Sequence, residues 1–119
     1  MRVSVSDKRS STRYQRSELP SELHNVSIKC PDGRLYPSRM VDLSAVGMRI
    51  AVQPGHCLES ELPPKGEPLG IEFPLLGIEL AGTCVHSETN PDDRVVIGVF
   101  VSNHFSRKKL EELLKTSLP

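Results

Sequence analysis

The chain of 119 residues has no tryptophan, and its two tyrosines and three phenylalanines bring the aromatic fraction to only 4%. Any hydrophobic core must therefore consist mainly of Val, Ile, Leu and Ala. No run approaches the roughly 18 consecutive apolar residues of a membrane-spanning helix, and the N-terminus lacks the apolar region of a signal peptide. We therefore expect a cytoplasmic protein without membrane insertion.

Residues for catalysis or metal binding are equally scarce. Cys30, Cys57 and Cys84 are odd in number and form no CxxC pair, which favours reduced thiols in a cytosolic protein. The four histidines lie apart, and no pair has the spacing of metal ligands. A glycine-rich phosphate loop and a nucleophile elbow are also missing from the sequence. We expect neither an enzyme nor a metal site or other cofactor.

The residues that are present predict one small domain built mostly of strands. A mass of 13.2 kDa fits a single domain, and ten prolines with eight glycines disfavour a helical bundle. Apolar residues alternate with polar ones in short segments that are separated by turn signals. This pattern predicts a small antiparallel barrel or sandwich with six strands, at residues 26–30, 35–41, 48–52, 69–73, 78–86 and 95–101.

The last part of the chain changes to a helical period, because its leucines recur three and four residues apart. Asn103 or Ser106 can cap the start of this helix. A start at Ser106 would place three cationic residues at the positive end of the helix dipole, which is unfavourable. We therefore expect a C-terminal helix that begins near Asn103.

Charge divides the chain into an N-terminal arm, residues 1–22, and a body, residues 23–119. The formal net charge is zero, but residues 1–17 hold five basic residues and one acidic residue, a net charge of +4 that the rest of the chain balances. The arm also lacks apolar periodicity, which predicts a flexible basic segment. Such a charge asymmetry indicates either an anionic partner or a solvated tail.

Two short patterns have functional interest. The first is RxxxR in the arm, formed by Arg9 and Arg13. The second is DxSxxG, which lies between the second and third expected strands and is formed by Asp42, Ser44 and Gly47. Taken singly, the first pattern occurs in many basic tails and the second in many β-turns. Neither pattern alone identifies a function.

In this order, before and within a β domain that ends in a helix, the two patterns resemble the signature of the PilZ-domain family of bacterial cyclic di-GMP receptors. The resemblance covers the chain from Lys8 to the final helix. It implies a mostly β fold: a six-stranded antiparallel β-barrel with a C-terminal α-helix over residues 23–119. It also implies that the basic N-terminal arm carrying RxxxR folds over the barrel and clamps the dinucleotide.

The resemblance further implies which residues bind the ligand: Arg9, Arg13, Asp42, Ser44 and Gly47, with secondary contacts from Lys8 and His86. Family members often carry a basic residue where His86 stands. The residue types suit these roles, since an arginine fork binds phosphate oxygens or a guanine edge and stacks on a purine. A carboxylate such as that of Asp42 can accept hydrogen bonds from the donor edge of guanine. Glycine at position 47 would permit a positive φ and a close approach of the base.

We therefore expect a receptor for cyclic di-GMP whose ordered arm changes the interaction with a partner protein in motility, biofilm or exopolysaccharide control, such as flagellar, pilus or polysaccharide machinery. One alternative is an adaptor with the same fold that binds proteins but no nucleotide. Another is a barrel that binds single-stranded nucleic acid, but this class needs aromatic stacking platforms and a basic groove. The few aromatic residues and the net acidic body argue against it, so we expect no DNA or RNA partner.

Overall fold

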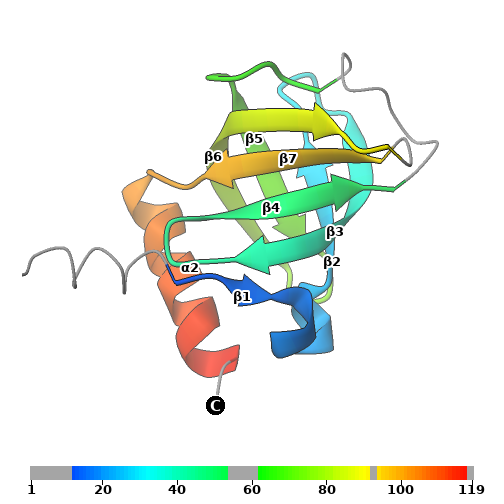
Figure 1. Cartoon of the computed structure of the whole chain (residues 1–119). Helices are drawn as coiled ribbons and strands as arrows, with labels where there is room; N and C mark the ends of the chain where they lie inside the picture. The colour runs from blue at the N-terminus through cyan, green and yellow to red at the C-terminus, as the bar shows by residue number, and fades with distance from the viewer. Residues whose placement is uncertain (1–11, 54–61, 92–93, 118–119) are drawn as a thin grey trace, which may run out of the picture.

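A computed structural model describes residues 12–53, 62–91 and 94–117 of the chain (Figure 1). The strands are β1 (Tyr14–Gln15), β2 (Asn25–Lys29), β3 (Leu35–Leu43), β4 (Gly47–Val52), β5 (Pro68–Phe73), β6 (Ile78–Thr89) and β7 (Val95–Phe100). Two 3-10 turns, η1 (Arg16–Glu18) and η2 (Ser21–Leu23), follow β1, and the helix α2 (His104–Ser117) follows β7. Within these ranges, no helix has the length and apolar character that crossing a bilayer requires.

Six of the strands close into an antiparallel barrel, as expected. They follow one another in the order β3, β2, β5, β6, β7 and β4, and β4 pairs back with β3. The short strand β1 was not expected. It pairs with the end of β3 on the side where β2 has already ended, since β2 pairs with β3 only as far as Arg39. The N-terminal segment is thereby held against the barrel wall.

The barrel interior is filled by aliphatic side chains, which confirms the composition argument. Buried residues alternate with more exposed ones in β2, β3 and β5, as in β3, where every second residue, Tyr36, Ser38 and Met40, is buried. Strand β7 has five buried residues out of six. The largest fully buried side chains come from the six barrel strands, from η2 and from α2: Phe73, Leu23, Ile28, Met40, Leu43, Met48, Ile50, Ile71, Leu80, Ile97, Leu110 and Val26.

A register shift in β3 sets the face on which Asp42 lies. The shift falls between Met40 and Asp42, so the inward alternation is interrupted there. Beyond it, Leu43 pairs with the buried Met48, while Asp42 pairs with Arg49, whose side chain reaches the outer surface. Paired residues of neighbouring strands share a face. Asp42 therefore belongs to the outer face of the barrel.

The helix α2 begins where the sequence predicts. The Asn103 side-chain oxygen accepts a hydrogen bond from the Ser106 backbone N–H at 3.1 Å, which is an N-cap contact. The Ser106 hydroxyl in turn accepts a hydrogen bond from the Ala81 backbone N–H at 2.8 Å and so joins the helix to β6. Leu110 and Leu113 belong to the core cluster. The helix therefore covers one end of the barrel, as Figure 1 shows.

The described part of the arm forms β1, η1 and most of η2, elements that its lack of apolar periodicity did not predict. Leu19 of the arm and Leu23, the first residue of the body, are buried in the core cluster, four residues apart. Glu18 accepts a hydrogen bond from the Gln15 backbone N–H at 2.8 Å, and the His24 Nε2 lies 2.9 Å from the Leu19 carbonyl oxygen. The two leucines supply the apolar burial that was not recognised in the sequence. The part of the arm before residue 12 lies outside the described residues.

Candidate functional site

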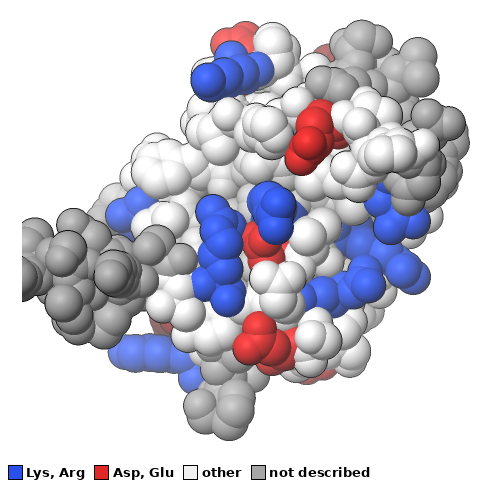
Figure 2. All heavy atoms as spheres, in the orientation of Figure 1, with Lys and Arg blue, Asp and Glu red and all other residues white. Residues whose placement is uncertain are grey.

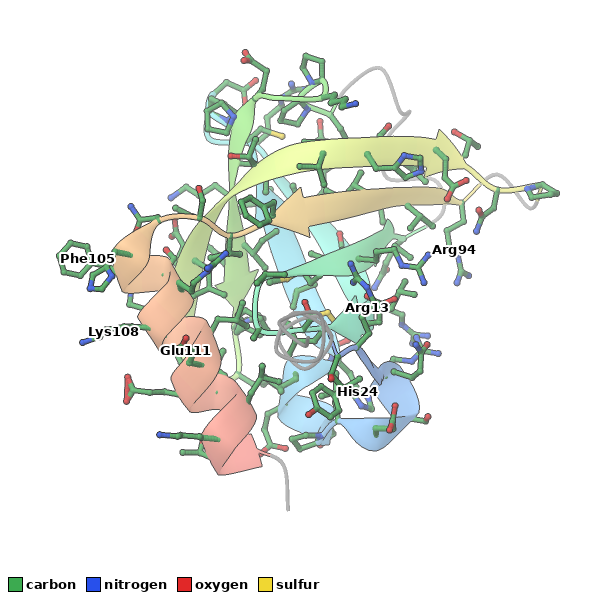
Figure 3. All side chains as sticks on the ribbon, turned by 60° about the vertical axis from the view of Figure 1, so that its left-hand side comes forward. Arg13, His24, Arg94, Phe105, Lys108 and Glu111 are labelled. Carbon is green, nitrogen blue, oxygen red and sulfur yellow. The ribbon has the colours of Figure 1, made fainter. Side chains whose placement is uncertain are left out.

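The two sequence patterns meet through one ion pair. Strand β1 lies beside the end of β3, with Tyr14 opposite Leu43 and Gln15 opposite Asp42. This register brings the preceding residue, Arg13, to Asp42, and the Arg13 Nη1 donates to the Asp42 Oδ1 at 2.8 Å. Figure 3 shows the Arg13 side chain beside the β3–β4 hairpin. The second arginine of RxxxR and the aspartate of DxSxxG therefore form a single cluster.

A second arginine, Arg49, completes this cluster and was missed by the sequence analysis. Its Nε and Nη2 both approach the Asp42 Oδ2, at 2.8 and 2.7 Å. Arg49 lies directly opposite Asp42 in the hairpin formed by β3 and β4. The signal was available in the sequence, because residues at equal distances from a tight turn pair across a hairpin. The turn around Ser44–Gly47 therefore predicts this partner for Asp42.

Asp42 is entirely covered by its partners. Its side chain is 0% exposed, whereas the side chains of Arg13 and Arg49 are 49% and 46% exposed. A buried carboxylate needs paired charges and hydrogen bonds, and here an arginine supplies them to each oxygen. A ligand that approaches this surface meets the guanidinium groups first. A direct contact of Asp42 with guanine, as the sequence analysis expected, would require one arginine to move.

Ser44 uses its polar groups within the turn. Its backbone N–H donates to the Gly47 carbonyl oxygen at 2.8 Å, and its hydroxyl donates to the same oxygen at 3.2 Å. The hydroxyl also accepts a hydrogen bond from the Val46 N–H at 3.3 Å. Ser44 is buried, so its hydroxyl stabilises the turn that fixes the position of Asp42.

The reason for glycine at position 47 differs from the one expected. The described glycines with positive φ are Gly33, Gly66 and Gly77, so the expectation of a positive φ at Gly47 was wrong. Gly47 instead pairs with Phe100, and a Cβ at Gly47 would collide with the backbone carbonyl oxygen of Val99. The residue is glycine because β7 packs too closely against β4 for any side chain.

The remaining expected residues stand apart from the cluster. His86 lies on β6 and is paired with Gly98, which is paired in turn with Arg49. His86 is therefore two strands away from Arg49, about 10 Å across the sheet, and its Nε2 lies 3.5 Å from the Glu88 carboxylate. The structure does not bring it into contact with the cluster. Lys8 and Arg9 lie outside the described residues.

Further basic side chains lie on the face that carries the cluster, and a hollow and a groove lie along the strands that build it. Figure 2 shows basic side chains over β3 and β4 on the face turned to the viewer. A small hollow of about 190 Å³ lies between Arg39 and Arg94. A larger groove of about 710 Å³ runs between β1 and α2, and it is lined by Tyr14, Ala45, Lys108, Glu111, Glu112, Leu114 and Lys115. Tyr14 follows Arg13, and Ala45 lies inside DxSxxG, so this groove adjoins both patterns.

Metal binding and thiol chemistry find little support among the described residues. Across residues 12–53, 62–91 and 94–117 there is no group of three or more His, Cys, Asp or Glu residues suited to a metal ion. Cys30 and Cys84 are free and buried. Burial raises the pKa of both thiols, although the nearby Arg34 partly opposes this effect at Cys30. Protonated, buried thiols are poor nucleophiles and metal ligands.

Comparison with known families gives one match that covers most of the chain. The family model described as "PilZ domain" matches residues 7–116. This range includes both sequence patterns and every described strand and helix except the last residue of α2. No curated protein matches the chain.

Solved structures with this fold include proteins crystallised with a nucleotide. The PilZ domain of YcgR from Escherichia coli, solved with c-di-GMP, superimposes with a TM-score of 0.55 at 11% identity, over 88% of this chain and 87% of that one. PlzA of Borreliella burgdorferi, in complex with c-di-GMP, gives a TM-score of 0.56 at 13% identity over 93% of this chain. The chain spans 43% of PlzA and 43% of the longer YcgR structure. The inhibitor of motility MotI/DgrA of Bacillus subtilis gives 0.51 at 15% identity, over 88% of this chain and 52% of that one.

Proposed function

The chain belongs to the PilZ domain family, and on that premise we propose that it is a cyclic di-GMP receptor without catalytic activity. The observation that carries the proposal is the ion pair between Arg13 and Asp42. This contact joins RxxxR to DxSxxG on the outer face of the barrel. Similar structures from Escherichia coli and Borreliella burgdorferi hold the same ligand, which supports the choice of cyclic di-GMP over other anions.

The chemistry of the cluster suits this ligand. Cyclic di-GMP carries two phosphate groups and two guanines, and it therefore presents anionic oxygens, acceptor edges and flat aromatic faces. Arginine can bind each of these, because its planar guanidinium forms paired hydrogen bonds with oxygens and also stacks on purines. The half-exposed Arg13 is available for such contacts while it remains held by Asp42. Lysine would keep the charge but lose the planar fork.

We assign different roles to the residues of the two patterns. Arg9 and Arg13 contact the ligand directly. Asp42 fixes the arginine that it binds, and it reaches a guanine only if that arginine swings away. Ser44 and Gly47 hold the turn and the close packing of β4 on β7 that place Asp42. Lys8 and His86 make secondary contacts at the edges of the ligand.

Ligand binding would change the protein surface beside the ligand, and this change would be the signal to a partner. Ligand contacts at Arg13 and around Asp42 would act directly on Tyr14 and Ala45, which line the groove between β1 and α2. A cytoplasmic partner protein that recognises this groove would then sense the nucleotide. MotI/DgrA, an inhibitor of motility with this fold, makes motility control one candidate pathway, beside biofilm and exopolysaccharide control. The same groove would serve the alternative function, a protein-interaction adaptor that binds no nucleotide.

Titration calorimetry of the unchanged chain tests the proposal. We expect cyclic di-GMP to bind with a Kd of about 1 μM or lower, and cyclic di-AMP and GTP to bind at least about tenfold more weakly, a gap of about 1.4 kcal/mol. Arg13→Ala should weaken binding of cyclic di-GMP. Arg34→Ala is the matched control, because it removes the same charge from the opposite end of β3, where Arg34 pairs with Asp32. Absence of cyclic di-GMP binding would favour the adaptor.

A further inference from the structure

We propose that Arg49, which belongs to neither sequence pattern, is a third ligand-binding arginine and that Arg13 and Arg49 together receive one phosphate group of the dinucleotide. This inference rests on the proposed function and adds a residue to its site. In this account Asp42 is a positioning residue. It holds the two guanidinium groups at a fixed separation, and they, rather than the carboxylate, contact the ligand.

The hydrogen bonds around Asp42 fix both arginines to one small group. Arg13 binds the Oδ1 at 2.8 Å, and Arg49 binds the Oδ2 through its Nε at 2.8 Å and its Nη2 at 2.7 Å. The two oxygens of a carboxylate are joined to one carbon, so the two guanidinium groups must lie on either side of it. Because Arg49 makes two hydrogen bonds, the orientation of its planar group is also restricted. Two arginines held in this way form a preorganised receptor for oxygen anions.

The net charge of the cluster and the exposure of its arginines also favour the binding of an anion. Two arginines and one aspartate leave a net charge of +1 in the cluster. One arginine would be enough to neutralise Asp42, so the second gives the cluster an excess that can attract an anion. The carboxylate is 0% exposed, while the Arg49 and Arg13 side chains are each about half exposed. The cluster therefore presents positive charge to the solvent and conceals its negative charge.

The neighbouring strand leaves room on the other side of Arg49. Its pairing partner on β7 is Gly98, which has no side chain to cover it. A Cβ at Gly98 would meet only Val85 and His86 of β6, at 3.5 Å or more. Packing therefore does not demand a glycine at this position, in contrast to Gly47. The absence of a side chain beside Arg49 is consistent with a surface that accommodates a ligand.

Binding of cyclic di-GMP to two Arg49 variants and one control tests the inference. Arg49→Gln removes the charge and the fork, whereas Arg49→Lys keeps a cation for Asp42 and removes only the fork. Arg39→Gln is the control, since Arg39 is an exposed arginine of the same strand, lies opposite Ala51, and is not among the hydrogen-bond partners of Asp42. We expect about tenfold weaker binding for Arg49→Gln, about fivefold weaker binding for Arg49→Lys, and a change below about twofold for Arg39→Gln. Arg49→Gln should also weaken the dependence of affinity on salt.

The melting temperature of each ligand-free variant separates a ligand contact from a purely structural one. We expect Arg49→Lys to bind more weakly while its melting temperature stays within about 2 °C of the unchanged chain, because a lysine can still neutralise Asp42. Wild-type affinity in both Arg49 variants would overturn the inference, provided that Arg13→Ala loses binding. A loss of affinity in Arg49→Lys that is matched by partial unfolding would also overturn it. Failure of the unchanged chain to bind cyclic di-GMP would overturn the proposed function and this inference together.

Discussion

Arg13 and Asp42 are 29 residues apart in the sequence, yet the Arg13 Nη1 and the Asp42 Oδ1 lie 2.8 Å apart in the structure. The contact exists because β1 pairs with the end of β3 beyond the point where β2 stops. The N-terminal arm is therefore attached to the turn between β3 and β4 by both backbone pairing and an ion pair. A substitution in either sequence pattern should therefore alter the position of the side chains in the other.

The role of Asp42 predicts the effect of removing its charge. In Asp42→Asn, the amide has one acceptor oxygen instead of two, so it can no longer hold both Arg13 and Arg49. We expect cyclic di-GMP to bind at least about tenfold more weakly and the free energy of unfolding to fall by about 1–3 kcal/mol. Calorimetric titration and urea unfolding measure these two quantities. Unchanged or stronger binding would show that Asp42 does not position the arginines.

The arginines of the arm should affect binding much more than folding. We expect Arg9→Ala and Arg13→Ala each to weaken binding of cyclic di-GMP by about 2 kcal/mol. The loss of stability in Arg13→Ala should stay within about 1 kcal/mol, because this side chain is half exposed and Asp42 keeps Arg49 as a partner. Titration and thermal unfolding of the ligand-free variants check both values. A strong loss of stability with intact affinity would assign the arginine to the fold.

Two glycines in adjacent strands should respond differently to alanine. In Gly47→Ala, the new methyl group collides with the carbonyl oxygen of Val99, which is backbone and cannot move aside. We expect the free energy of unfolding to fall by about 1–3 kcal/mol. Gly98→Ala is the matched control, since its methyl group meets only side-chain carbons at 3.5 Å or beyond and a backbone nitrogen at 4.0 Å. Equal stability of the two variants in urea would contradict the packing described for β4 and β7.

The buried thiols predict both a reactivity and a pH dependence. We expect Cys30 and Cys84 of a Cys57→Ser variant to react slowly with an aromatic disulfide reagent at pH 8 and rapidly in denaturant, since burial raises the pKa of both thiols. The folded chain holds these thiol protons more tightly than the unfolded chain does. Thiol ionisation should therefore lower the free energy of unfolding as the pH rises above about 8.5, the ordinary cysteine pKa. Rapid reaction of both thiols in the native chain would refute their burial.

The barrel strands could be predicted from the sequence because the patterns that indicate them depend on neighbouring residues. Alternation at Val26, Ile28 and Cys30 depends only on neighbouring residues, and the cap at Asn103 depends on the next turn of helix. The strand ends were less accurate. Strand β6 continues to Thr89, past the expected end at His86, because pairing with β7 extends it through polar residues. The alternation of burial alone could not reveal that extension.

The site was only partly predictable, because its geometry depends on contacts between distant segments. The resemblance supplied Arg13 and Asp42, but not the strand pairing that joins them. Arg49 was overlooked for another reason: it looked like an ordinary exposed residue of a half-buried strand, although its place opposite Asp42 could be counted from the turn. The need for glycine at position 47 does depend on a distant segment, because a side chain there would collide with the carbonyl oxygen of Val99 on β7.

Cyclic di-GMP is expected to bind at the cluster of Arg13, Asp42 and Arg49 and to stabilise the pairing of β1 with the β3–β4 hairpin, and amide hydrogen exchange with and without saturating ligand tests this most directly. Strand β1 is held by only two residue pairs, and its arginine is half exposed, so its amides should exchange readily in the free chain. On addition of cyclic di-GMP we expect protection to rise at residues 12–16 and 42–49 and to change little in β7, which is already buried. Cyclic di-AMP at the same concentration should produce a smaller effect. Unchanged exchange at residues 12–16 and 42–49 under saturating cyclic di-GMP would contradict the account.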